Sequence, residues 1–362
     1  MNVLIISPER YQNFYTSKIQ IANLLKKKHN VFFLNPYLSI KEKKFSDERV
    51  SGIHIINILS VNFLYSVKDP INHYVNMIYK RVPKIDLIWS FDTNRANLFR
   101  NLNSKTKLFH VTDNFFNKKS IEIINKNSDC ILTVSRKLKK GFDKKKVFVV
   151  GHFLMRNFLN TRFQVNKNEQ QIIAISGNFH MKEFNSKLLK KLVNNKKKIT
   201  FYLIGPILED HFRYKLKLDK ERVKDLNTII QRKNVKIFGV LHPLKLIKLY
   251  KKISCFCILY KKRMDNSHKI FEFFSTGYPI ISNSKFLSFK DDYFEMIFHK
   301  HTKENELLKL MQSKNFKQNK YSLKRKKLVK NKTYEKLIET VTRFSNKKNL
   351  KLFKQIEVEE KI

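Results

Sequence analysis

The chain of 362 residues is long enough for two domains, and its 42% hydrophobic and 13% aromatic residues exclude wholesale disorder. A net charge of +45 points to nucleic acid or an anionic membrane, yet 61 of the 75 basic residues are lysine, whereas nucleic-acid readers favour arginine. We therefore expect no nucleic-acid partner and retain an anionic membrane surface as a partner.

The N-terminal residues and the cysteines bear on location. Residues 3–6 are apolar but follow no basic leader, so we expect no secretory signal. No apolar run approaches the ~18 residues that a membrane-spanning helix needs. Cys130, Cys255 and Cys257 form an odd set without zinc-type spacing. We expect a reduced, cytoplasmic protein, with a peripheral position on the inner face of the membrane as an extension of that expectation.

Short apolar runs alternate with helical segments through the first half of the chain. An amphipathic helix is predicted over 16–28, between buried strands at 3–7 and 30–36. Further short apolar runs follow at 53–59, 87–89, 108–111, 130–134 and 147–150. This alternation predicts an α/β fold with a parallel, doubly wound sheet, in a first domain over 1–160.

The second half repeats the alternation after a polar stretch at about 155–170, which we interpret as a linker. Strands are predicted at 171–176, 200–204, 234–239 and 254–259, with helices near 185–193, 219–232 and 243–251. This pattern predicts a second α/β domain over 161–325. An amphipathic helix over about 323–344 follows, and residues 346–362 are expected to be a basic and polar tail that is solvated or disordered.

Three of the seven glycines, Gly177, Gly205 and Gly239, lie at the carboxyl ends of predicted strands. In open α/β sheets the ligand crevice lies beyond the carboxyl ends of the strands, and glycine allows a backbone to approach a ligand closely. Ordinary strand-end turns are the alternative interpretation. Neither GxGxxG nor GxxxxGK[ST] occurs, so the sequence supports neither a dinucleotide fingerprint nor a P-loop.

The most informative stretch is 268–281, HKIFEFFSTGYPII, which predicts a helix, a glycine stop and a buried strand. Lys269 and Glu272 are three residues apart and share a helix face. The apolar residues around them predict burial, and buried charges rarely lack a partner. A surface Lys–Glu pair within one helix is the alternative to a ligand site.

Residues 268–281 resemble the Lys-x-x-Glu-Tyr-x-Ala-x-Gly-x-Pro-Val-Val pattern of nucleotide-sugar glycosyltransferases with the GT-B fold, most nearly the retaining, family-4-type enzymes of bacterial polysaccharide and lipid synthesis. Supporting stretches lie in the family's order at 175–179, 201–206, 234–239 and 331–336. The resemblance implies two Rossmann-like domains facing a cleft, with the acceptor in the first and the donor nucleotide in the second. It also implies that a closing helix over 326–345 crosses back onto the first domain.

The resemblance implies a role for each matching residue. Glu272 would accept hydrogen bonds from the ribose hydroxyls, and Lys269 would meet the diphosphate at the start of its helix. Gly177 would let the chain pass close to the phosphates, Lys182 would add a second phosphate contact, and the other two glycine turns would complete the pocket. Met264 stands where many members carry a glutamate that contacts the donor sugar, so sugar recognition stays open.

Residues 108–115 resemble the family segment that carries an aspartate or histidine facing the acceptor. If the reaction inverts the anomeric centre, Asp113 is the predicted general base and His110 the alternative. If it retains the configuration, no protein nucleophile is required and the leaving diphosphate itself can assist. A core histidine and a turn or helix-cap aspartate are the structural alternatives. Asp92 also has two interpretations, as a residue that lines the acceptor cleft or as part of a strand-end turn.

We therefore expect a hexosyl or related transferase that moves a sugar from a UDP- or GDP-linked donor to a saccharide or lipid-linked acceptor, in the synthesis of cell-surface polysaccharide or glycolipid. Lys269 and backbone amides would stabilise the departing diphosphate. No metal or cofactor is expected, and the basic clusters at 137–140 and 324–327 are interpreted as solvated helix faces. An epimerase-type or other nucleotide-sugar enzyme of GT-B fold, and a basic nucleic-acid-binding protein, remain as alternatives.

Overall fold

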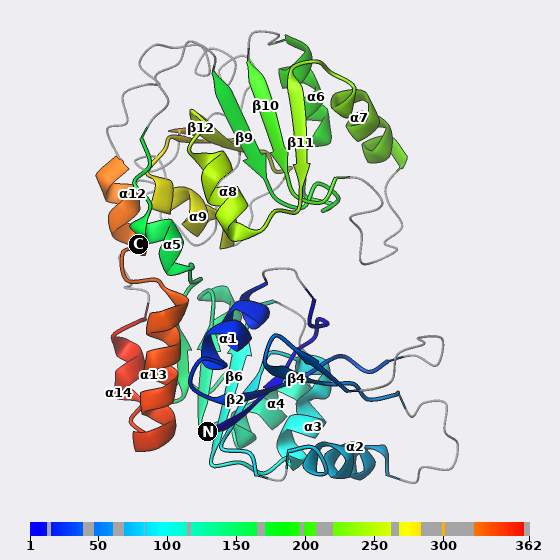
Figure 1. Ribbon diagram of the computed structural model, residues 1–362, viewed down its shortest axis with the longest axis vertical. Helices are drawn as coiled ribbons and strands as arrows, with labels where there is room; N and C mark the ends of the chain where they lie inside the picture. The colour runs from blue at the N-terminus through cyan, green and yellow to red at the C-terminus, as the bar shows by residue number, and fades with distance from the viewer. Residues whose placement is uncertain are drawn as a thin grey trace. The chain divides into compact units, whose positions relative to one another are not determined.

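The structure is a computed structural model of the chain. It describes residues 1–12, 16–38, 47–60, 69–82, 84–113, 117–164, 171–195, 199–207, 220–261, 268–283, 299–300 and 322–357. The chain forms two compact units (Figure 1). The first unit joins Met1–Gly151 to the C-terminal segment Tyr334–Glu359, and the second contains His152–Thr333.

The described strands of the first unit form one sheet of eight strands, in the order β3-β4-β2-β1-β5-β6-β7-β8. All neighbouring strands are parallel except β3 and β4, which are antiparallel. The strands are β1 (Asn2–Ile6), β2 (Asn30–Leu34), β3 (Glu48–Val50), β4 (Ile53–Ile56), β5 (Leu87–Ser90), β6 (Thr106–Val111), β7 (Cys130–Thr133) and β8 (Val147–Val149). The sequence predicts every one of these strands except β3, a three-residue edge strand with exposed side chains.

Helices of the first unit connect the parallel strands. They are α1 (Ser17–Leu25), α2 (Pro70–Tyr79), η2 (Thr93–Arg95), α3 (Ala96–Asn101), α4 (Lys118–Asn127) and η3 (Lys137–Lys139). Side chains cap the starts of α2, η2 and α4. At the start of α2, the Asp69 carboxylate accepts hydrogen bonds from the Ile71 and Asn72 amides, and Pro70 occupies the first helical position. Asn117 caps α4 through the Ser120 amide.

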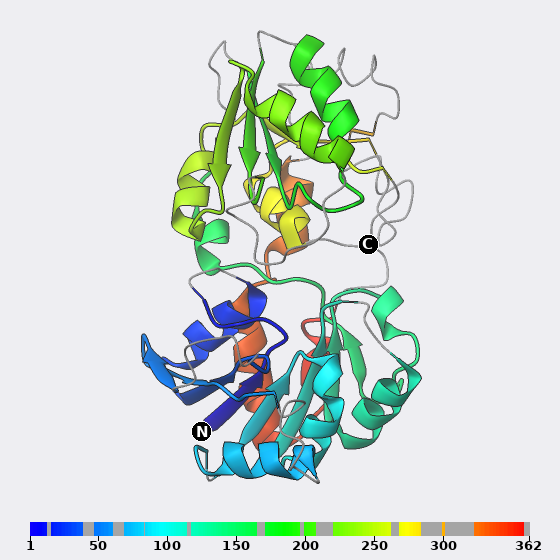
Figure 2. The same cartoon turned by 90° about the vertical axis from the view of Figure 1, so that its right-hand side faces the viewer.

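The C-terminal segment is part of the first unit. Helix α13 (Tyr334–Lys347) packs against α1 and runs along the sheet (Figure 2), and the hydroxyls of Thr106 and Ser345 lie 3.0 Å apart. Helix α14 (Lys351–Lys354) follows, with Phe353 fully buried and its ring packed on Phe148. The expectation of a solvated tail after residue 345 is therefore wrong as far as residue 357, because apolar side chains anchor this segment.

The described strands of the second unit form a parallel sheet of six strands, in the order β11-β10-β9-β12-β13-β14. They are β9 (Ile172–Ser176), β10 (Thr200–Ile204), β11 (Val235–Gly239), β12 (Cys255–Ile258), β13 (Ile280–Ser282) and β14 (His299–Lys300). The helices are α5 (Arg156–Asn160), α6 (Ser186–Asn195), α7 (Lys220–Ile230), α8 (Pro243–Tyr250), α9 (His268–Thr276) and α12 (Ser322–Val329).

Apolar side chains cover both faces of the second sheet, as a parallel sheet requires. On β9, Ile173 and Ile175 join one core with α6 and α7, whereas Ala174 joins a second core with α5, α8, α9 and α12. Burial on both faces explains why the strands of this unit are continuous apolar runs. It also places α9, which carries the most informative sequence motif, inside a core and not on a free surface.

Two boundaries differ from those expected. The units divide after Gly151 and not after residue 160, because the stretch interpreted as a linker starts with α5 and buries Phe158 and Phe163 in the second unit. The single helix expected over 323–344 is two helices, α12 and α13, separated by a turn that ends at Thr333, where one unit gives way to the other.

The described residues also bear on the basic clusters and on membrane crossing. Within the cluster at 324–327, Arg325 is 1% exposed and its Nε donates to the Gly277 carbonyl at 3.4 Å, so this arginine is a core residue of the second unit and not part of a solvated face.

Among the helices described, none combines the length and apolar character needed to cross a membrane.

Candidate functional site

A pocket of about 400 Å³, part of it open solvent, lies in the second unit where β9 and β12 end. Ser176 and Gly177 at the end of β9 form one wall, together with Asn178 of the following loop. Ile258 and Tyr260 form another wall, and Lys269 at the start of α9 contributes a cation. The pocket therefore occupies the position at which open α/β sheets bind ligands, and a helix N-terminus faces it.

Close backbone approach shapes this end of the sheet. Gly177 donates its amide to the Ile204 carbonyl at 3.0 Å, and Gly205 donates to the Gly239 carbonyl at 2.7 Å. Gly205 has φ +134°, and a Cβ there would lie 1.9 Å from the Gly177 carbonyl oxygen, so only glycine fits. A Cβ at Gly177 would instead meet nothing within 4 Å.

The three glycines thus have different positions relative to the pocket. Gly177 lines it, whereas Gly205 and Gly239 are outside its lining and set how closely the ends of β9, β10 and β11 approach. Open space above Gly177 is what a ligand that approaches the backbone would require. Gly177 can therefore contact a ligand, whereas Gly205 and Gly239 act on the spacing of the strand ends around it.

Helix α9 carries the charged centre of the site. Lys269 Nζ lies 3.1 and 3.0 Å from Glu272 Oε1 and Oε2, so the ammonium is shared by both carboxylate oxygens. The Glu272 side chain is 6% exposed and the Lys269 side chain 36%. The Lys–Glu pair that the spacing predicts is present, but its anion is buried and its cation faces the pocket.

Two further residues hold the same carboxylate. Tyr250 of α8 donates its hydroxyl to Glu272 Oε2 at 3.1 Å, and His268 Nδ1 lies 3.3 Å from Oε1. Burial alone would raise the pKa of Glu272, but the charge of Lys269 and the hydrogen bond and charge of His268 outweigh it and lower the pKa to about 2. Glu272 is therefore a permanently ionised hydrogen-bond acceptor next to the pocket.

Lys182 and the loop that follows β9 lie at a different place. Lys182 is exposed and is outside the pocket lining. The loop is held by Arg222 of α7, which donates to the His180 carbonyl at 2.7 Å. The His180 ring is buried, which together with the nearby Arg222 charge lowers its pKa to about 4. Met264 lies outside the described residues.

The two candidate bases of the first unit differ in exposure. His110, on β6, is 3% exposed and its ring packs on Phe91 and Trp89; neither ring nitrogen has a hydrogen-bond partner among the described residues. Burial, with a smaller contribution from Lys18, lowers the pKa of His110 to about 3, so the ring is neutral at physiological pH. Asp113 follows β6 on the surface and accepts a hydrogen bond from the Thr112 hydroxyl at 2.9 Å.

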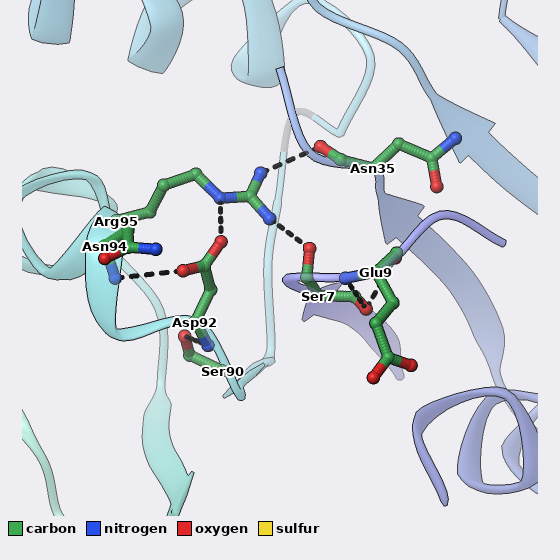
Figure 3. Close-up of polar contacts among 7 residues, drawn as sticks. All are labelled: Ser7, Glu9, Asn35, Ser90, Asp92, Asn94 and Arg95. Atoms are coloured by element: carbon green, nitrogen blue, oxygen red, sulfur yellow. Dashed lines mark hydrogen bonds and ion pairs between the residues drawn. The ribbon is translucent and has the colours of Figure 1, made fainter. Parts of the chain in front are cut away.

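Asp92 belongs to a buried cluster at the carboxyl ends of β1, β2 and β5 (Figure 3). Its carboxylate accepts from Arg95 Nε at 2.7 Å and from the Asn94 amide at 2.9 Å. The remaining Arg95 donors reach the main-chain carbonyls of Asn35, at 2.8 Å, and Ser7. Asp92 is therefore engaged in joining three strand ends and capping η2, as the strand-end interpretation predicts.

Tyr250 and His268 are site residues that the sequence reasoning did not select. His268 is four residues before Glu272, so a helix drawn from residue 268 would have placed both on one face. No such signal was available for Tyr250, which lies 22 residues earlier on a different helix and meets Glu272 only through packing. Among the described residues, no group of three or more His, Cys, Asp and Glu side chains is arranged to hold a metal ion.

The chain, with its two units built on parallel sheets, has the GT-B fold, which is found in glycosyltransferases. HepE of Anabaena, solved with UDP-glucose, superposes with a TM-score of 0.66 at 10% identity over 96% of this chain and all of that one. A glycosyltransferase of Rickettsia africae gives 0.61 at 15% identity over 98% of both chains. Sucrose-phosphate synthase of Thermosynechococcus elongatus gives 0.63 at 11% identity, over 96% and 98%.

At the level of sequence alone, no protein-family model and no curated protein matches this chain. The likeness to the solved structures is therefore one of fold, and it extends over nearly the whole of each chain.

Proposed function

We propose that this protein is a glycosyltransferase that takes a sugar from a nucleoside diphosphate donor, UDP- or GDP-linked, and transfers it to an acceptor hydroxyl. The observation that carries the proposal is the pocket beyond β9 and β12, which is lined by a partly exposed ammonium and an uncrowded glycine backbone and has a buried carboxylate paired with that ammonium beside it. The cation of Lys269 suits a diphosphate, and the carboxylate of Glu272, which can only accept hydrogen bonds, suits a ribose diol. The uncrowded backbone at Gly177 allows a phosphate to approach closely.

In the proposed complex, Lys269 leaves Glu272 and pairs with the diphosphate, and Glu272 accepts hydrogen bonds from the ribose hydroxyls. Lys269 can make this exchange because its side chain is 36% exposed and extends from the first turn of α9 into the pocket. The N-terminal end of that helix adds positive potential for the phosphates. Lys182 is the candidate for a second phosphate contact from the loop after β9, since its side chain is exposed and Gly177 and Asn178 at the start of that loop line the pocket.

The reaction breaks the bond between the anomeric carbon and the diphosphate oxygen and forms a bond between that carbon and the acceptor oxygen. Negative charge develops on the leaving diphosphate, where Lys269 and the N-terminal end of α9 stabilise it. The acceptor proton goes to the diphosphate in a retaining reaction. In an inverting reaction it goes to a base, for which exposed Asp113 is better suited than the enclosed ring of His110.

We extend the proposal to a saccharide or lipid-linked acceptor used in cell-surface polysaccharide or glycolipid synthesis on the cytoplasmic side of a membrane. Support comes from the charge, since 75 basic residues against 30 acidic ones favour proximity to anionic headgroups. HepE of Anabaena, which shares the fold, has been solved with UDP and glucose.

A thermal-shift panel with UDP, GDP, CDP and dTDP tests the nucleotide site. One diphosphate should raise the melting temperature of the wild-type protein, and Glu272→Ala should lower the affinity for it by about a hundredfold, because two hydrogen bonds to a charged acceptor are lost. Glu221→Ala is the matched control, since this glutamate lies on α7 in the same unit with its side chain 62% exposed.

Equal shifts in wild type and Glu272→Ala would refute the ribose role, and no shift with any diphosphate would refute the function. Product analysis then separates a transferase from an epimerase-type enzyme of the same fold. Release of the free nucleoside diphosphate only when an acceptor is present supports transfer, whereas an altered sugar still attached to the nucleotide supports the alternative.

A further inference from the structure

The Glu272 carboxylate has more partners than a pair with Lys269 requires. Lys269 contacts both oxygens, Tyr250 donates to Oε2 at 3.1 Å, and His268 Nδ1 lies 3.3 Å from Oε1. These partners differ in mobility, because Lys269 is partly exposed whereas Tyr250 is fully buried. When the ammonium pairs with a diphosphate, the two other side chains remain on the carboxylate.

Tyr250 is held by aromatic packing and cannot follow a departing partner. Its ring lies 4.9 Å from the Phe256 ring and 6.3 Å from the Phe273 ring, both nearly edge-on. Burial, followed by the charge of Glu272, raises the pKa of the Tyr250 hydroxyl well above its usual value, so the group stays a donor. Its hydrogen bond therefore fixes the orientation of one carboxylate oxygen.

His268 is fixed from its other side. Its Nε2 lies 2.8 Å from the Phe153 carbonyl oxygen, and its ring meets the His152 ring edge-on at 5.8 Å. The ring is thus held between the Phe153 carbonyl and the Glu272 carboxylate. This contact with Glu272 does not depend on Lys269.

We propose that Tyr250 and His268 are positioning residues that keep the Glu272 carboxylate oriented for the ribose diol while Lys269 binds the diphosphate. This inference rests on the proposed nucleotide site. On this inference, three side chains from α8 and α9 together determine the preference for ribose over a sugar that lacks the 2′ and 3′ hydroxyls. Glu272 makes the contact, and the other two side chains set its geometry.

The test compares two probes in the full-length protein by isothermal titration: the nucleoside diphosphate selected by the panel and its 2′,3′-dideoxy counterpart. In wild type we expect the ribose form to bind about a hundredfold more tightly, as two hydrogen bonds to a charged acceptor imply. Glu272→Ala should bring the ratio of the two dissociation constants near one. Tyr250→Phe and His268→Gln should each reduce it about tenfold.

Tyr202→Phe is the matched control, because Tyr202 is a buried tyrosine of the same apolar core that does not meet Glu272, and its ratio should equal that of wild type. A ratio is informative even if a variant is less stable, since partial unfolding lowers the amount of binding protein for both probes alike. His268→Asn provides a second variant if His268→Gln does not fold.

The outcomes separate the inference from the function on which it rests. If neither probe binds wild type, the nucleotide site is refuted. If both bind and the ratio stays at the wild-type value in Tyr250→Phe and His268→Gln, the positioning role is refuted and the nucleotide site stands. If the ratio falls in one variant only, the role of the other residue is refuted.

Discussion

Each unit contains an ion pair of residues three apart, close to the carboxyl ends of its parallel strands, and the two pairs differ in the exposure of the cation. In the first unit, Asp92 and Arg95 are 2.7 Å apart with side chains 6% and 4% exposed. In the second, Lys269 and Glu272 are 3.0 Å apart with the lysine 36% exposed. The anion is buried in both pairs, so the difference lies in what the cation can still reach.

The Arg95 guanidinium is used by the protein itself. Its donors reach the Asp92 carboxylate and two main-chain carbonyls from other strand ends, and its Cζ lies 5.4 Å from the centre of the Tyr37 ring. The Lys269 ammonium instead contacts one carboxylate and faces a pocket. A buried cation that joins strands stabilises a fold, whereas a half-exposed cation on a helix N-terminus can change partners.

The largest effect that would sharpen this comparison is expected at Arg95. Arg95→Met leaves the Asp92 carboxylate buried without its cation and frees two main-chain carbonyls, so the free energy of unfolding should fall by about 3–5 kcal/mol in urea titrations. The affinity of the folded protein for the nucleoside diphosphate should not change.

Arg100→Met is the control for this substitution, because Arg100 is exposed on α3 and its loss should alter the free energy of unfolding by less than about 0.5 kcal/mol. Equal losses of stability in both variants would contradict the role assigned to the Arg95 cluster.

Lys269→Met should have the opposite effects, with a small loss of stability and a large loss of affinity for the nucleoside diphosphate. Loss of this charge lowers the free energy of unfolding by about 1 kcal/mol, since solvent screens the partly exposed ammonium and Tyr250 and His268 remain on the carboxylate. The dissociation constant for the nucleoside diphosphate should rise about tenfold or more, because the diphosphate loses a charge-assisted contact. Lys251→Met removes one exposed charge at the end of α8 and should leave binding unchanged. A large loss of stability with unchanged binding would show that Lys269, like Arg95, stabilises the fold and does not bind the ligand.

The remaining effect concerns the charge of Glu272. Its pKa falls from 4.5 to about 2 on folding, so its ionisation stabilises the fold above the unfolded value and this contribution disappears as the pH falls through the folded value. The difference in unfolding free energy between wild type and Glu272→Gln should therefore be constant from pH 7 to 5 and shrink between pH 4.5 and 2. Urea titrations across this range measure it, and a loss already complete at pH 5 would disagree.

Most of the fold could be predicted because its strands are buried on both faces and appear as short apolar runs. The runs at 130–134 and 147–150 match β7 and β8 closely. The edge strand β3 could not be found, since its three residues bury little and gain their pairing only from β4. The C-terminal segment misled for a different reason: lysine is its commonest residue, yet three buried side chains, Leu352, Phe353 and Ile356, anchor it.

The charged centre of the site could be predicted in part. Spacing on one helix predicts the pair of Lys269 with Glu272, and a glycine after a strand predicts the open wall at Gly177. The spacing does not distinguish which charge is buried, because that depends on how α9 packs against α8. Contacts between helices, such as that of Tyr250 with Glu272, exist only in the folded core.

The path of the chain between the units has a consequence for synthesis on the ribosome. All described residues of the second unit precede Tyr334, whereas the first unit needs the segment after it to cover Phe148 and to pair Thr106 with Ser345. Domains usually complete folding in the order in which they are translated. Here the unit that starts first is expected to finish last, with α13 and α14 docking as a final step.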